Sequence, residues 1–199
     1  DASINSFDTE TRSDGKIYLL SYVYDNSNGS ATVGNSDFEP LDAETIFSIL
    51  TKKKTREPAV NVWYNLDFDA NALFGTVLSE SQMIDLADTN ETTFEFNGME
   101  YELTYINGKF LSISDSNRHS YTHYDISQFF NVPLDQAAQD WLGIAKDDID
   151  PTKADEYEWN TVLEYAKKDA FLTQQLWKKF VELGEYELGI PLGKPISTG

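Results

Sequence analysis

The chain has 199 residues, 40% of them hydrophobic and 14% aromatic, which predicts one folded domain and excludes wholesale disorder. It has no cysteine and no apolar run of about 18 residues, so we expect no thiol-based site, no membrane partner and a cytoplasmic location. Aspartate and glutamate number 34 against 15 lysines and arginines, a net charge of -19 that taken alone argues against a nucleic-acid partner. Two explanations of this acidity stay open: a surface adapted to high salt, or one domain of a larger protein whose basic surfaces lie elsewhere.

The first half of the chain alternates strand and helix patterns. Runs rich in aromatic and β-branched residues predict strands at 4–7, 16–24, 30–33 and 60–64. Helical spacing predicts one helix at 42–51, with Asp42 as its N-cap, and another that opens at Asp69 and runs to 78. The stretch 79–90 is polar and is expected to connect this helix to the next strand. A basic cluster follows the first helix and is expected to complement its C-terminus: Lys52, Lys53, Lys54 and Arg56.

The second half opens with two Asn-Gly turns, which predict a three-stranded meander at 93–96, 101–106 and 110–113. This meander is either an insertion or an extension of the sheet. A last strand is expected at 121–130 and a short helix at 134–141, stopped near Gly143. An acidic loop at 146–157 then leads to the longest helix, predicted at 158–183 with Gly184 as its C-cap.

Three groups of carboxylates stand out from this framework. Asp8 and Glu10 are two positions apart on a strand and share one face, where they repel each other unless a cation lies between them. Asp69 lies at a strand-to-helix junction. Asp169 shares a helix face with Tyr165 among core positions, where an unpaired carboxylate is rare. Each group alone has an ordinary explanation, such as a solvated strand edge or a helix N-cap, but together they favour a divalent-metal site built from oxygen ligands.

In order and separation, these groups resemble the motifs of the 3'-5' proofreading exonuclease domain of family B DNA polymerases, in the RNase H-like superfamily. The Asp-x-Glu motif matches Asp8 and Glu10, and the Tyr-x-x-x-Asp motif matches Tyr165 and Asp169. The Asn-x-x-(Phe or Tyr)-Asp motif lies between them in the chain and matches Asn65, Phe68 and Asp69.

A finer resemblance points to the protein-primed branch of that family. Lys146, followed by Asp147, Asp148 and Ile149, is similar to the branch's Lys-x-x-hydrophobic motif. The branch's (Ser or Thr)-Leu pair is absent, because Ile126 and Ser127 occupy the aligned places.

The resemblance implies an α/β, RNase H-like exonuclease fold: a central mixed β-sheet flanked by helices, with a β-meander insertion at about 92–114. The domain would span 1–188, and 189–199 would be a linker toward a polymerase region. It implies two divalent ions, Mg²⁺ or Mn²⁺, that clamp the attacking and leaving oxygens. Their ligands would be Asp8, Glu10, Asp69 and Asp169, and Tyr165 would orient the attacking water. Thr11, Asn65, Phe68 and Lys146 would hold a single-stranded 3' end of DNA.

Further partners implied are the remainder of a DNA polymerase and a terminal protein primer. The alternatives are a stand-alone 3'-5' exonuclease on DNA or RNA, a catalytically silent DNA-guiding module, and an unrelated acidic binding domain. At the level of single residues, Phe68 could instead pack in the core and Lys146 could be an ordinary surface lysine. Lys52–Lys54, Lys167 and Lys168 are candidates for additional contacts to DNA, whereas His119 and His123 are expected to be incidental.

Overall fold

The structure is a computed structural model that describes residues 3–24, 29–52 and 59–187. The predicted linker at 189–199 lies outside these ranges, as do Lys53, Lys54 and Arg56 of the basic cluster. Within the described part of the chain, no helix is both long and apolar enough to cross a bilayer.

A single eight-stranded mixed sheet forms the centre of the fold, in the order β3-β2-β1-β4-β8-β7-β6-β5. β1 pairs in parallel with β4, and β4 in parallel with β8, while the remaining neighbours are antiparallel. The meander therefore continues the central sheet through β8. The strands are β1 (Ser3–Thr11), β2 (Ile17–Tyr24), β3 (Gly29–Gly34), β4 (Ala59–Trp63), β5 (Glu91–Phe96), β6 (Met99–Ile106), β7 (Phe110–Asp115) and β8 (Ser120–Asp125).

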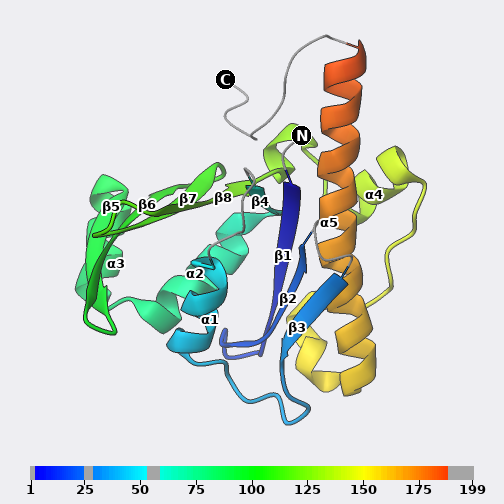
Figure 1. Ribbon diagram of the computed structural model, residues 1–199. Helices are drawn as coiled ribbons and strands as arrows, with labels where there is room; N and C mark the ends of the chain where they lie inside the picture. Colours follow the sequence, from blue (N-terminus) through cyan, green and yellow to red (C-terminus); the bar gives the residue numbers. More distant parts are fainter. Residues whose placement is uncertain (1–2, 25–28, 53–58, 188–199) are drawn as a thin grey trace.

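Helices cover both faces of the sheet (Figure 1). α1 (Ala43–Leu50) and α2 (Leu66–Val77) lie on one face, α4 (Leu134–Leu142) and α5 (Trp159–Glu187) lie on the other, and α3 (Glu80–Thr89) packs beside β5. Two short 3-10 segments, η2 (Ser127–Phe129) and η3 (Pro151–Glu156), precede α4 and α5 respectively.

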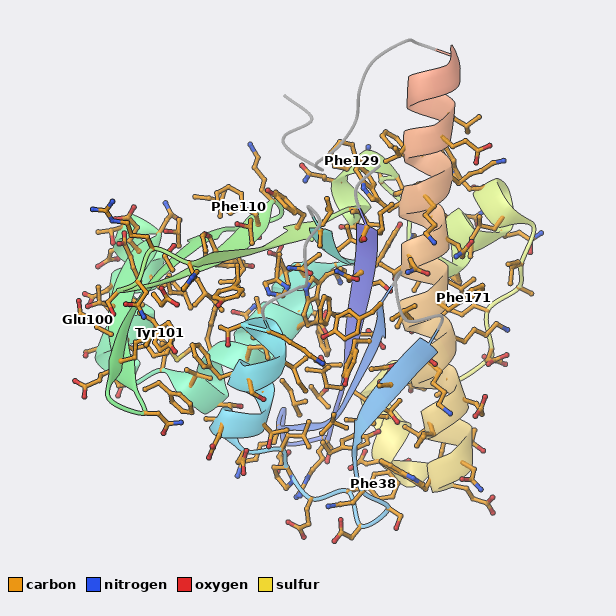
Figure 2. All side chains as sticks on the ribbon, in the orientation of Figure 1. Phe38, Glu100, Tyr101, Phe110, Phe129 and Phe171 are labelled. Carbon is orange, nitrogen blue, oxygen red and sulfur yellow. The ribbon has the colours of Figure 1, made fainter. Side chains whose placement is uncertain are left out.

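Alternation along β1 divides the core between these two faces. Phe7 packs into the hydrophobic cluster that α1 and α2 cover. Its ring stacks on that of Trp63, with 5.3 Å between the ring centroids. Ile4, on the other face, joins the cluster covered by α5. Figure 2 shows Phe129 beside the upper part of α5, where its ring centroid lies 5.2 Å from that of Trp177. Because side chains of a strand alternate, the even-numbered residues of β1 point toward α5.

The polar stretch 79–90, predicted to be a connection, is in fact a helix. α3 begins with a capping box, in which Ser79 Oγ accepts from the Gln82 amide at 3.3 Å and Gln82 Oε1 accepts from the Ser79 amide at 2.8 Å. Leu86 is its single buried residue. The helix therefore lies almost entirely in solvent, and the apolar periodicity that predicts helices is missing from its sequence.

Three predicted boundaries are also wrong. α2 begins at Leu66, three residues before Asp69, so Asp69 lies inside the first turn and is not the N-cap. β8 ends at Asp125, and the chain turns into η2 where the strand was predicted to continue. α5 runs through Gly184 to Glu187, so this glycine does not end it. The predicted N-cap Asp42 and the stop of α4 at Gly143 agree with the structure.

Candidate active site

Three of the predicted metal ligands converge between β1 and α5. Asp8 and Glu10 lie on the even-numbered face of β1, and Asp169 lies on α5 opposite them. One carboxylate oxygen from each falls within 4.8 Å of the others. Glu10 and Asp169 are buried, and Asp8 is partly exposed. This spacing suits a divalent cation, which needs several oxygens within a few ångströms of one another.

Two side-chain hydrogen bonds fix α5 against β1 next to this cluster. Ser6 Oγ donates to the carbonyl oxygen of Ala170 at 2.5 Å, and Gln174 Nε2 donates to the carbonyl oxygen of Ile4 at 2.8 Å. Both side chains are buried, so these bonds are shielded from water. They set the register of the helix along the strand and thereby hold Asp169 opposite the two strand carboxylates.

Asp69 reaches the cluster from the opposite side, on α2. Its Oδ1 accepts hydrogen bonds from the Thr9 amide at 3.2 Å and from the Thr9 hydroxyl. Thr9 lies between Asp8 and Glu10 on the strand, so this contact ties the first turn of α2 to the same short stretch of β1. Asp69 lies outside the group of three whose oxygens share one 4.8 Å cluster, although its charge raises the pKa of Asp8.

Burial is the main cause that raises the pKa values of all four carboxyl groups, and the charges of neighbouring carboxylates add to it. Burial, followed by the charges of Glu10, Asp169 and Asp69, raises the pKa of Asp8 well above its usual range. Burial raises the pKa of Glu10 to about 8 and that of Asp69 to about 7, the latter in spite of the hydrogen bonds from Thr9. Burial likewise raises the pKa of Asp169 to about 6, opposed by the nearby Lys146. The site therefore needs additional positive charge before all four groups can ionise near neutral pH.

Two oxygens of this cluster, Asp8 Oδ2 and Asp169 Oδ1, are buried and have no hydrogen-bond partner. A buried oxygen of this kind costs free energy unless a donor or a cation satisfies it. Hard carboxylate oxygens are the ligands that Mg²⁺ and Mn²⁺ prefer. The donor set and its two unsatisfied oxygens therefore fit a divalent ion held by Asp8, Glu10 and Asp169.

Lys146 and Tyr165 flank the Asp169 side of the cluster. Lys146 Nζ lies 3.2 Å from Asp169 Oδ2 and 4.9 Å from the centre of the Tyr165 ring. Burial lowers the pKa of Lys146, but the interactions with Asp169 and Tyr165 together outweigh this effect, and the pKa is raised overall. Burial and Asp169 raise the pKa of the Tyr165 hydroxyl. At neutral pH the lysine is therefore charged and the phenol is neutral.

A hollow of about 720 Å³ opens over these groups. On one side it is lined by the carboxylates, Lys146 and Tyr165, and on the other by Asn65 and Phe68 at the start of α2. Phe68 is 53% exposed, so its ring is free to meet a ligand and the core-packing alternative is wrong. Thr11 is buried near an irregularity in the β1–β2 pairing and does not line the hollow, so its contact with DNA stays a prediction.

Asp125, which was not among the residues predicted from the sequence, organises this side of the hollow. Asp125 is buried at the end of β8, and its carboxylate accepts from the backbone amides of Asn65, Leu66 and Ser127 at 3.1, 3.0 and 2.9 Å. It also accepts from the Ser127 hydroxyl at 2.6 Å. Asn65 itself has a left-handed backbone (φ 61°) and makes no side-chain cap, so Asp125 supplies acceptors for the start of α2.

The remaining candidates lie away from the hollow. His123 is buried in the core, where its Nδ1 accepts from Trp63 Nε1 at 3.0 Å and its Nε2 bonds the carbonyl oxygen of Leu50 at 2.9 Å. Lys167 pairs with Glu164 and Lys168 with Asp147, and none of these four residues lines the hollow.

Comparison with solved structures places this architecture beside Phi29 DNA polymerase. The chain matches that enzyme complexed with single-stranded DNA at a TM-score of 0.55 and 15% identity, over 98% of this chain and 33% of the polymerase. A primer-template complex of the same polymerase matches at a TM-score of 0.52 and 16% identity, with the same coverage. No family model and no curated protein sequence matches the chain. The predicted fold is confirmed, and the chain spans about a third of the length of the polymerase chains that it matches.

Proposed function

We propose that this domain is a 3'-5' exonuclease that hydrolyses the terminal phosphodiester of single-stranded DNA, as the proofreading part of a family B polymerase of the protein-primed type. The observation that carries the proposal is the cluster of Asp8, Glu10 and Asp169, which includes two buried oxygens without partners. It lies at the floor of a hollow that Phe68 and Asn65 border. The fold shared with a DNA polymerase supports DNA as the substrate.

The four carboxylates would hold two divalent ions, Mg²⁺ or Mn²⁺. Glu10 and Asp169 would act together with Asp8, because oxygens of these three residues lie within 4.8 Å of one another, and Asp69 would join them from α2. When bound, such ions supply Lewis acidity for the attacking and leaving oxygens of the phosphodiester. The protein's own part is to keep these carboxylates fixed on β1, α2 and α5.

Tyr165 and Lys146 would act on the reacting groups directly. Since its pKa is raised, the Tyr165 phenol is neutral and can orient a water molecule by hydrogen bonding, but it is a poor base. Lys146 stays protonated beside Asp169 and would stabilise the negative charge that develops on the phosphate.

Phe68 and Asn65 would hold the terminal nucleotides. An exposed aromatic ring can stack on a base without regard to sequence, and an amide can hydrogen-bond the base or the sugar. Such a grip needs an unpaired strand, because a base inside a duplex is already stacked and paired. The rest of a polymerase and a terminal protein remain the expected partners of the domain.

The test is the degradation of a 5'-labelled single-stranded DNA oligonucleotide in Mg²⁺ or Mn²⁺. We expect a ladder that shortens from the 3' end, abolished by Asp8→Asn/Glu10→Gln. The matched control is Asp88→Asn/Glu95→Gln, which removes two charges from exposed positions on α3 and β5 and should leave the ladder unchanged. Absence of cleavage together with absence of Mn²⁺ binding in calorimetry would favour the silent-module alternative, and equal cleavage of RNA would favour the stand-alone nuclease.

A further inference from the structure

A carboxylate outside the metal-ligand set ties the start of α2 to the meander. Asp67 lies in the first turn of α2, between Asn65 and Asp69. Its Oδ1 accepts a hydrogen bond from the Gly108 amide at 2.9 Å and another from the Tyr105 hydroxyl. Both donors belong to the end of β6 and its turn into β7, some 40 residues further along the chain, so this contact is tertiary.

Two further contacts hold the same turn. The Tyr105 ring packs edge-on against Phe74 of α2, with 5.1 Å between ring centres. The carbonyl oxygen of Lys109, which follows Gly108, accepts from the Asp125 amide at 2.8 Å. Because the Asp125 carboxylate in turn binds the amides at the start of α2, the turn, the end of β8 and the start of α2 form a closed ring of contacts.

This ring encloses one side of the substrate hollow. Gly108 lines the hollow together with Asn65, Phe68 and Asp67 itself. We propose that Asp67 is a positioning residue, which holds the β6–β7 turn as a wall of the hollow and thereby fixes Phe68 and Asn65 for the single-stranded end of DNA. The proposal rests on the exonuclease function proposed above and assigns the meander a part in substrate binding.

The contribution of Asp67 should fall on binding and not on the chemical step. On the reacting side of the hollow, Ser6 and Gln174 hold α5 against β1, and Thr9 of β1 holds Asp69. None of these contacts involves the β6–β7 turn. A wall fixed in advance spares the protein the entropic cost of ordering it when DNA binds. Loss of the tie should therefore raise KM for single-stranded DNA and leave kcat unchanged.

The negative charge of Asp67 would weaken DNA binding, because it repels the phosphates of an incoming strand, whereas its hydrogen bonds to the turn would strengthen binding. Asp67→Asn separates the two effects. An asparagine keeps an oxygen that accepts from Gly108 and Tyr105 and removes the charge, whereas Asp67→Ala removes both.

The experiment compares steady-state cleavage of a single-stranded DNA oligonucleotide by Asp67→Ala, Asp67→Asn and Tyr105→Phe. We expect KM to rise about 5- to 10-fold in Asp67→Ala, with kcat within about 2-fold of the wild type. Asp67→Asn should keep the wild-type KM or lower it, and Tyr105→Phe should fall between the two. Amide hydrogen exchange of Gly108, followed without DNA, should be faster in Asp67→Ala and unchanged in Asp67→Asn.

The chain offers a control in Asp115, whose carboxylate also accepts hydrogen bonds from turn amides, in this case within its own β7–β8 turn. Its Oδ1 accepts from the amides of Asn117 and His119, both at 2.9 Å, and it does not line the hollow. Asp115→Ala should loosen that turn and leave KM unchanged.

Three results would overturn the proposal. The first is an equal rise of KM in Asp67→Ala and Asp67→Asn, and the second is a loss of kcat without a change in KM. The third is unchanged Gly108 exchange in Asp67→Ala. Failure of the proposed exonuclease function itself would be distinguishable, because the wild-type protein would then neither bind nor cleave DNA.

Discussion

At the scale of single residues, the site concentrates negative charge that the protein alone does not neutralise. Asp8, Glu10 and Asp169 share one cluster, and Lys146 is the only cation among the described residues that line the hollow. Burial of these carboxyl groups raises their pKa values, with repulsion between them as a smaller cause, and two of their buried oxygens have no partner. A cation that binds here should therefore act on the stability of the fold as well as on catalysis.

The first prediction concerns the stability of the metal-free protein. The pKa values of Glu10, Asp69 and Asp169 are raised by folding to about 8, 7 and 6, from ordinary values near 4. A group whose pKa is raised by folding stabilises the fold at low pH, and this contribution is lost as the pH rises through the folded value. Denaturant titrations without metal should therefore give a free energy of unfolding that is several kcal/mol higher at pH 5 than at pH 8.

Mn²⁺ should reverse this trend, because it binds the ionised carboxylates of the folded state and stabilises that state most at pH 8. The double variant Asp8→Asn/Glu10→Gln supplies the control, since the remaining surface charge is almost unchanged. Its stability should vary much less with pH and should not respond to Mn²⁺. A variant that keeps the full pH dependence would show that general charge repulsion, and not this site, is the cause.

The second prediction concerns Lys146. Lys146→Met keeps most of the aliphatic stem that packs beside Tyr165 but removes the charge 3.2 Å from Asp169. Loss of one electrostatic stabiliser of the transition state typically lowers kcat by a factor on the order of 100. Cleavage rates at saturating DNA and metal should show this loss. Lys153→Met is the matched control, because Lys153 is exposed on η3 and does not line the hollow; a similar loss there would contradict the role given to Lys146.

The clustering of Asp8, Glu10 and Asp169 could be predicted from the sequence because it starts from local geometry, whereas the catalytic roles of these residues stay a prediction. Two carboxylates at i and i+2 on a strand, or a phenol and a carboxylate at i and i+4 on a helix, share a face whatever surrounds them. Asp67 and Asp125 could not be found in this way. Their partners lie about 40 to 60 residues away, and an aspartate in a helical first turn or at a strand end has many ordinary roles.

At the scale of elements, Asp125 joins three of them, and this leads to the third prediction. Asp125→Ala would leave the amides of Asn65, Leu66 and Ser127 without their acceptor. A buried donor left unsatisfied costs about 1–3 kcal/mol, and two of these amides also need an acceptor at the start of a helix. We expect the free energy of unfolding to fall by about 2–4 kcal/mol in urea titrations.

The comparison for this variant is Asp42→Ala at the N-cap of α1. Asp42 caps that helix with one hydrogen bond to the Thr45 amide at 2.8 Å, in an exposed position. A single exposed N-cap bond of this kind should contribute less to stability than a buried carboxylate with several donors. If Asp125→Ala lowers the free energy of unfolding no more than Asp42→Ala does, the Asp125 carboxylate does not hold β8, α2 and η2 together.

Helices and strands could be predicted where one face is buried, because their apolar residues then recur at helical or strand spacing. The strands of the meander and α5 follow this rule, because each buries one face. α3 does not follow it, since Leu86 is its single buried residue. Its capping box, Ser79 with Gln82, was the available signal. The end of β8 and the start of α2 were predicted at the wrong residues. Both boundaries depend on a tertiary contact, in which the Asp125 carboxylate at the end of β8 accepts from the Leu66 amide at the start of α2.

At the scale of the whole molecule, a net charge of -19 has to be reconciled with the polyanionic substrate proposed above. The hollow brings the four proposed metal ligands together with Asp67 and Asp125. Without divalent ions, such a surface should repel DNA. Affinity for DNA should therefore depend on bound divalent ions, on Lys146 and on stacking at Phe68, with little from a general basic surface.

The fourth prediction follows from this balance and concerns the salt dependence of DNA binding. Each phosphate neutralised by a lysine or arginine contributes a slope of about −0.7 to the plot of log K against log salt for single strands. With Lys146 as the cation of the hollow, the slope should lie between about 0 and −1. Fluorescence anisotropy of a labelled oligonucleotide in KCl, at fixed and saturating Ca²⁺, measures it. Lys146→Met should bring the slope close to zero, with Lys153→Met as control. A wild-type slope of about −3 or steeper would require several more cations on the DNA path, and the binding surface would then extend well beyond the hollow.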